Sequence, residues 1–181
     1  VTANSMYNGA EGPNHTKVME HGASSVAMGG NNTTCNIYGV AMGGSNIVRG
    51  RGSAAMGESC DASGDWSVAI GQDCSATGPY CIAMGCSNTA DWNIGGASTC
   101  RGASIAMGGL NRTRQNCDIA MGYDNDCSGG AAVCLGQENT ITDGSSGGGG
   151  DGTAQSAVAI GRGNHAAGSY SVAMGKGCIA R

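Results

Sequence analysis

A four-residue pattern of bulky apolar, small, bulky apolar and glycine recurs along the chain. The tetrapeptide [V/I/A]-[A/C]-[M/I/L]-G occurs ten times, and seven of the nine intervals between successive motif glycines are 14 residues. The motif ends at Gly29, Gly43, Gly57, Gly71, Gly85, Gly108, Gly122, Gly136, Gly161 and Gly175. Because alternate side chains of a strand point to opposite faces, this pattern predicts one short β-strand in every repeat.

The length of the repeat predicts how these strands are connected. Fourteen residues provide two strands of about five residues and two short turns. A second glycine recurs seven residues after the motif glycine, at Gly50, Gly64, Gly78, Gly129 and Gly168, where it favours a sharp bend. We therefore expect an all-β parallel β-solenoid (a β-roll) of about ten 14-residue coils, spaced about 4.8 Å apart. A helix is less favourable, because each glycine would cost it about 1 kcal/mol and no heptad pattern is sustained.

The repeat also indicates the organisation of the chain. We expect the solenoid over residues 23–181, with insertions near 86–100 and 144–152. Residues 1–22 lie outside the clear repeat and would either cap the first coil or pair with a neighbouring chain. The chain begins at Val1 without Met or an apolar leader, which fits a processed secreted protein or an excised segment.

The two faces of the predicted strand differ in size, which leaves two arrangements open. Either Val and Met fill the coil interior, or Ala and Gly line a narrow interior and the Val/Met stripe packs against other chains. We favour the second arrangement, because monomers rarely expose so large an apolar stripe, and we predict self-association. The stripe comprises Val26, Met28, Val40, Met42, Val68, Ile70, Ile82, Met84, Ile105, Met107, Ile119, Met121, Val172 and Met174.

Composition narrows the setting. The chain has a formal net charge of -4 and no cluster of Lys and Arg, which argues against a nucleic-acid partner. No apolar run approaches the roughly 18 residues of a membrane-spanning helix, so we expect no membrane insertion. Ten cysteines without a C-x-x-C pair favour disulfides in an oxidising compartment over a zinc site. Cys60 and Cys74 share one phase of neighbouring coils, so we name them as disulfide candidates.

Other motifs carry less chemistry. Asn14, Asn32 and Asn111 begin N-x-[ST] triplets and are candidate glycosylation sites. The segment 124–129 resembles the opening of a calcium loop, but Leu135 stands where that loop needs glutamate, so we expect no metal. Trp66, Tyr80 and Tyr170 share one phase, and such a row either packs in an interface or binds sugars. We find no catalytic constellation and no cofactor motif.

The repeats resemble those of a known family. Ser67-Val68-Ala69-Ile70-Gly71 followed by Gly78, and Ser171-Val172-Ala173-Met174-Gly175, are similar to the S-V-A-I-G repeat of trimeric autotransporter adhesin heads (YadA-like). The resemblance covers about residues 23–143 and 153–181. It implies a left-handed parallel β-roll, three chains side by side and adhesion to host matrix or surfaces. No catalytic residue of that family carries over.

Three function classes follow from these observations. We predict an extracellular structural or adhesive protein, not an enzyme, that self-associates into a trimeric head or a filament. Its further candidate partner is a matrix protein or a glycan. The alternative is an ice-binding solenoid, whose regular face would be the column Ser25, Ser53, Ser67, Ser104 and Ser171. A solenoid carbohydrate-active enzyme is less favoured, because no carboxylates or histidines form a groove motif.

Overall fold

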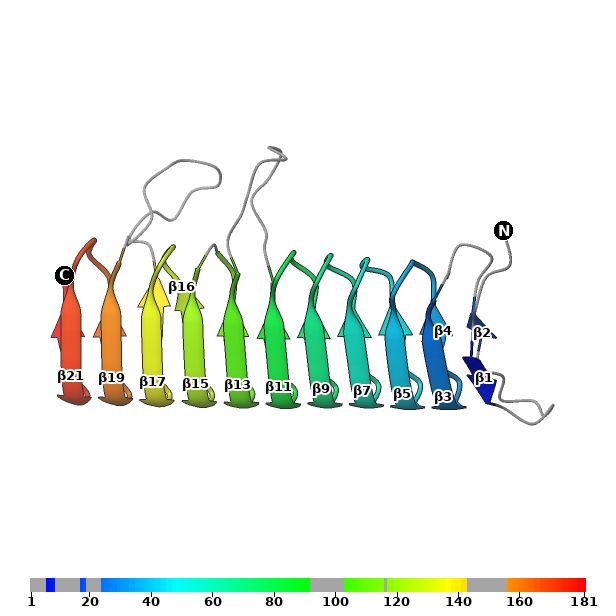
Figure 1. The fold of residues 1–181 in the computed structure, drawn as a ribbon. Coiled ribbons are helices and arrows are strands. Elements are labelled where there is room, and N and C mark those ends of the chain that lie inside the picture. Colours follow the sequence, from blue (N-terminus) through cyan, green and yellow to red (C-terminus); the bar gives the residue numbers. More distant parts are fainter. Residues whose placement is uncertain (1–5, 9–16, 19–23, 92–102, 116, 143–155) are drawn as a thin grey trace.

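The computed structural model describes residues 6–8, 17–18, 24–91, 103–115, 117–142 and 156–181. In these residues the chain forms two parallel sheets of eleven strands each and no helix. Figure 1 shows the strands side by side in one continuous stack. The structure therefore confirms the predicted all-β parallel β-solenoid.

Odd-numbered strands form the first sheet, called sheet A here. Its members are β1 (Met6–Asn8), β3 (Val26–Gly30), β5 (Val40–Gly44), β7 (Ala54–Glu58), β9 (Val68–Gln72), β11 (Ile82–Cys86), β13 (Ile105–Gly109), β15 (Ile119–Tyr123), β17 (Val133–Gln137), β19 (Val158–Arg162) and β21 (Val172–Lys176). From β3 onward, each strand of sheet A carries one copy of the four-residue motif.

Even-numbered strands form sheet B on the opposite side of each coil. Its members are β2 (Lys17–Val18), β4 (Thr33–Thr34), β6 (Ile47–Val48), β8 (Asp61–Ala62), β10 (Ser75–Ala76), β12 (Thr89–Ala90), β14 (Arg112–Thr113), β16 (Asp126–Ser128), β18 (Thr140–Thr142), β20 (His165–Ala166) and β22 (Ile179–Ala180). Each coil thus contributes one longer strand to sheet A and one shorter strand to sheet B.

The register stacks equivalent positions of successive repeats. Val40 pairs with Ala54 and Met42 with Met56, so every column of the repeat becomes a row along the stack. The register continues across both insertions, since Ile82 pairs with Ile105 and Val133 with Val158. An insertion therefore leaves the coil without shifting the inward and outward columns.

The first insertion begins later than the sequence suggested. Cys86 is the last residue of β11, and Thr89–Ala90 forms β12, so this part of the expected insertion 86–100 belongs to a regular coil. The remainder from residue 92, and the insertion expected at 144–152, lie outside the described residues. Within residues 1–22, β1 pairs with β3 and β2 with β4, extending both sheets by one strand. The role of this segment as a cap or a chain-pairing element stays a prediction.

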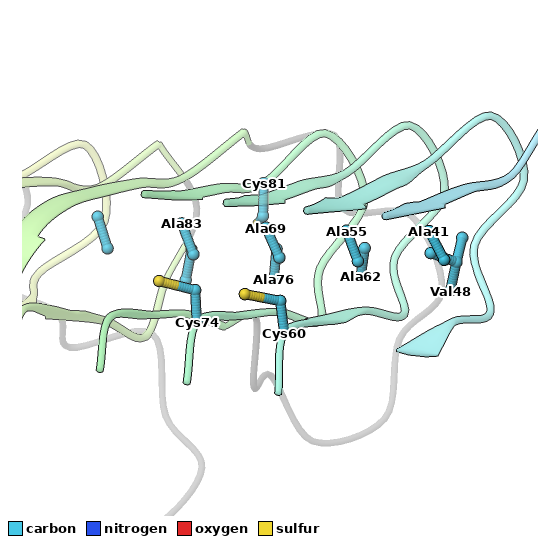
Figure 2. Packing of buried hydrophobic residues seen from close by; sticks show 12 residues of the cluster. Ala41, Val48, Ala55, Cys60, Ala62, Ala69, Cys74, Ala76, Cys81 and Ala83 are labelled. Atoms are coloured by element: carbon cyan, nitrogen blue, oxygen red, sulfur yellow. The ribbon is translucent and has the colours of Figure 1, made fainter. Parts of the chain in front are cut away.

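Small side chains fill the coil interior. The middle residue of the motif points inward and is 0% exposed at Ala41, Ala55 and Ala69, for example. Sheet B supplies the facing column, in which Ala62 and Ala76 are also 0% exposed (Figure 2). The structure therefore has the narrow, alanine-lined interior that we favoured, and Val and Met lie outside it.

The motif glycine is required by the closeness of the coils. Gly71 has φ +125°, a conformation that side-chain-bearing residues rarely adopt. A Cβ built on Gly71 would lie 1.9 Å from the carbonyl oxygen of Gly85 in the next coil. Both the backbone conformation and the close approach therefore select glycine at this position.

Candidate functional site

The outer face of sheet A carries the apolar stripe that the sequence predicts. Its side chains are half-buried or exposed, from 38% exposed at Met42 to 60% at Met174. The structure places all the predicted members in two rows along this face: Val26, Met28, Val40, Met42, Val68, Ile70, Ile82, Met84, Ile105, Met107, Ile119, Met121, Val172 and Met174. The stripe is continuous because the register stacks equivalent positions of all ten motif strands.

The outer face of sheet B is mainly polar. Arg49 forms an ion pair with Asp61 at 3.1 Å, and Arg114 forms one with Asp126 at 2.7 Å. In each pair the two side chains come from successive coils, and all four are at least partly exposed. Exposed pairs of this kind stabilise the fold only weakly, but they suit a face that remains in water. The solenoid is therefore amphipathic, with its apolar face on sheet A.

A buried asparagine ladder runs along one edge of the interior, and the sequence analysis missed it. Its members lie three residues after the motif glycine and are 0–1% exposed: Asn32, Asn46, Asn88, Asn111, Asn125, Asn139 and Asn164. The Asn46 amide nitrogen donates to the carbonyl oxygens of Met42 and Gly57, both at 2.9 Å, and to Asn32 Oδ1 at 3.0 Å. The signal was present in the sequence as a recurring Gly-x-x-Asn.

Cys60 and Cys74 occupy two positions of this same ladder. Both are buried with free thiols in this structure. The Cys60 thiol donates to the carbonyl oxygen of Gly71 at 3.3 Å, and the Cys74 thiol donates to that of Gly85 at 3.3 Å. Figure 2 shows the two sulfur atoms directed the same way along the stack. Each cysteine thus replaces an asparagine as a donor to the next coil, and a disulfide between them stays a prediction.

Two candidate glycosylation sites prove to be ladder residues. The amide nitrogen of Asn32 donates to the carbonyl oxygens of Met28 at 2.6 Å and Gly43 at 2.9 Å. Asn111 is 1% exposed and is engaged in the same way. Since a glycan would have to be attached to this buried nitrogen, the prediction is wrong for both residues in the folded chain. Asn14 lies outside the described residues and stays a prediction.

The serine column considered as an ice-binding face lies mainly inside the coil. Ser25, Ser53, Ser67 and Ser104 are 0–1% exposed. Ser53 Oγ donates to the Gly64 carbonyl oxygen at 2.6 Å, so the hydroxyl holds the turn. These hydroxyl groups cannot form a regular surface for ice, and this support for the alternative function is lost.

One position of this column holds a buried aspartate. Asp118 is 0% exposed, and its carboxylate accepts hydrogen bonds at 3.1 Å from the backbone N–H groups of Gln115 and Ala132. Burial raises the pKa of Asp118 to about 7, although these hydrogen bonds and those from Gly129 and Gly130 oppose the shift. The carboxylate has no cationic partner among these contacts, so its ionisation is linked to the stability of this coil.

A row of aromatic side chains follows one corner of the solenoid. Trp66, Tyr80 and Tyr170 have φ between 58° and 60° and are 46%, 53% and 73% exposed. Tyr38 has the same conformation and is 57% exposed, so it is a further member that the sequence analysis did not include. The Arg51 guanidinium lies 5.9 Å from the centre of the Trp66 ring. The rings project to the surface, and both interpretations of them, interface packing and sugar binding, stay predictions.

The described residues contain no group of three or more His, Cys, Asp or Glu arranged to hold a metal ion. A surface hollow of about 230 Å³ is lined by Arg112, Asp124 and Asp126, without histidine or cysteine. In the part of the chain that the structure describes, no helix is long and apolar enough to cross a membrane. The site with the most extensive geometry is therefore the stripe.

Comparison with known families agrees with this geometry. The model of the YadA head domain repeat matches residues 153–177 in two copies, a segment that contains β19, β20 and β21. No curated protein matches the chain. The match and the parallel β-solenoid together confirm that the chain carries YadA-like head repeats.

Proposed function

We propose that this chain is an extracellular, non-enzymatic adhesive head whose copies associate through the stripe on sheet A. The YadA head repeat supports an adhesive function of the kind found in trimeric autotransporter adhesins. The observation that carries the proposal is the continuous apolar stripe, which lies opposite a mainly polar face. Association through the stripe leaves sheet B free to contact a matrix protein or a glycan.

The size of the stripe favours association on energetic grounds. Burying the remaining exposed part of one Val or Met contributes about 1 kcal/mol, roughly half of the value for full burial. Two rows along ten strands would then contribute on the order of 20 kcal/mol. The loss of translational and rotational freedom on association costs about 4–15 kcal/mol. The apolar surface is therefore large enough to hold copies of the chain together.

The native mass of the protein tests this proposal. Light scattering of the unreduced protein is expected to give three chains per particle, and electron microscopy should show discrete heads. Long polymers would replace the head by a filament while keeping the stripe as the contact. A monomer at micromolar concentration would contradict the proposal.

A pair of variants separates the stripe from the rest of the surface. Met84→Glu with Met107→Glu places two charges on adjacent strands β11 and β13 of the stripe. Ser75→Glu with Thr89→Glu places the same charges on adjacent strands β10 and β12 of sheet B. We expect the first variant to be monomeric and the second to keep the native mass. Equal masses for the two variants would show that the stripe is not the contact.

A further inference from the structure

The coil interior is built from two facing columns. One column is the middle residue of the motif on sheet A, and the other is the second residue of each strand of sheet B. Figure 2 shows these columns meeting in the earlier coils, where Ala41 lies opposite Val48 and Ala69 opposite Ala76. Successive members of the two columns are seven residues apart in the regular coils. The side chains in these columns therefore touch across the interior.

Cys127 and Cys134 occupy both facing columns at one level of the stack. Cys127 is the middle residue of β16, and Cys134 takes the alanine position of the motif in β17. Both side chains are 0% exposed and belong to one buried cluster. Among the described coils, no other cysteine stands in either column. Sulfur thus faces sulfur here, where other coils place alanine, valine, threonine or isoleucine.

The contacts show that the two thiols meet. Cys134 Sγ reaches across the interior to within 3.8 Å of the carbonyl oxygen of Asp126, the residue next to Cys127. A hydrogen bond to the Cys134 thiol and burial both raise the pKa of the Cys127 thiol. The pair differs from Cys60 and Cys74, which lie on one wall and direct their thiols to separate carbonyl oxygens.

We propose that Cys127 and Cys134 form a disulfide across the coil interior. The two thiols lose two protons and two electrons, and a small disulfide such as oxidised glutathione accepts them and becomes two thiols. One cysteine thiolate attacks the glutathione disulfide and releases one glutathione. The other thiolate attacks the mixed disulfide and releases the second glutathione. Because both sulfur atoms are fully buried in the fold, the exchange takes place while the chain folds.

Differential alkylation of the exported protein tests this bond. The chain is produced by secretion into an oxidising compartment, denatured in acid guanidinium, and treated with N-ethylmaleimide to block free thiols. Reduction and iodoacetamide then label the cysteines that were oxidised. The tryptic peptide 115–162 contains Cys117, Cys127 and Cys134, and its fragmentation assigns each label. We expect iodoacetamide on Cys127 and Cys134, whereas N-ethylmaleimide on both would overturn the proposal.

Two variants identify the partner. In Cys134→Ala, Cys127 should take up N-ethylmaleimide, and iodoacetamide at Cys127 would show that it pairs elsewhere and would overturn the proposal. The double variant Cys127→Ala with Cys134→Ala recreates the alanine pair of Ala62 and Ala69 and is expected to fold. Reductant should raise the unfolding equilibrium constant of the parent roughly tenfold or more relative to that of the double variant. An equal effect of reductant on both proteins would contradict the bond, whatever the oligomeric state.

Discussion

Replacing the motif glycine by alanine separates the two reasons for which the solenoid needs it. In Gly71→Ala the new Cβ would lie 1.9 Å from the Gly85 carbonyl oxygen, and the backbone is at φ +125°. Gly175 has the similar φ of +119°, but the atom nearest to a Cβ added there is Cys178 Sγ at 3.4 Å. Gly44 has no positive φ, and a Cβ added there would have nothing within 4 Å. The three substitutions therefore test strain with overlap, strain without overlap, and neither.

The expected losses differ enough to be resolved. Strain at a positive φ costs about 1–3 kcal/mol, so Gly175→Ala should lose about that amount. Gly71→Ala carries the same strain, and its Cβ overlaps an oxygen by more than about 1 Å of ordinary contact distance. Relief of that overlap would pull two coils apart and break backbone hydrogen bonds of about 1 kcal/mol each. We expect a total loss of about 4 kcal/mol or more for Gly71→Ala, and a change within about 0.5 kcal/mol for Gly44→Ala.

Urea unfolding followed by far-ultraviolet circular dichroism measures these losses at one fixed protein concentration. Because coils at the end of a solenoid can open separately, amide hydrogen exchange of Val172–Lys176 provides the local reading for Gly175→Ala. If Gly71→Ala were no less stable than Gly175→Ala, the contact with the next coil would not be what selects glycine. If Gly175→Ala matched Gly44→Ala, backbone strain would not be the reason either.

Two further substitutions test the interior polar groups. Asn125→Ala should cost about 1–3 kcal/mol in urea unfolding, because it leaves the buried Gly136 carbonyl oxygen without the donor that now lies at 2.9 Å. Asn125→Cys should lose less, as Cys60 shows that a thiol can serve as this donor, and an equal loss would contradict that role. For Asp118, the folded chain holds its proton up to about pH 7, whereas the unfolded chain releases it near the ordinary aspartate pKa of 3.8. The contribution of this group to stability therefore falls as the pH rises from about 4 to about 7, by on the order of 4 kcal/mol at about 1.4 kcal/mol per pH unit. Asp118→Ser should remove this slope from the pH dependence of the unfolding free energy, and an unchanged slope would assign it to other groups.

The architecture was predictable because the repeat constrains it at two levels. A 14-residue interval that persists through seven of nine intervals requires one structural unit per interval. The alternation within the motif then separates an alanine column from the Val and Met columns. The choice between the two interiors needed a physical argument, namely that so little side-chain volume faces the alanine side. The structure bears out that choice, with Ala41 and Ala55 at 0% exposure.

The polar interior was harder to predict because periodicity does not show direction. Asn32 and Asn111 matched a glycosylation triplet, and nothing in that triplet shows that their amides point into the coil. Cys60 and Cys74 shared a phase, which correctly placed them on neighbouring coils. Their thiols nevertheless donate to carbonyl oxygens of the following coil, as the neighbouring asparagines do. The recurrence of asparagine in their own column was the sequence feature that could have indicated this role.

The boundary of the first insertion illustrates a second limit. An interval of 23 residues shows that nine are extra but does not show where they leave the coil. The structure completes β11 and β12 before the chain departs, because the partner strands β13 and β14 need both as hydrogen-bonding neighbours. A parallel solenoid thus tolerates an insertion where it preserves the register of both sheets, and pairing along the stack decides this.

The narrow interior links the stability of the fold to its association. An alanine interior buries little apolar surface per coil compared with the Val, Ile and Met side chains of the motif. In this solenoid those larger side chains lie on the outer face of sheet A, where Met28 and Met121 remain 39% and 40% exposed. The chain thus places much of its available hydrophobic burial outside the coil. If copies associate through this stripe, the same contact that forms the head also supplies burial that the interior lacks, so folding and assembly are stabilised by one surface.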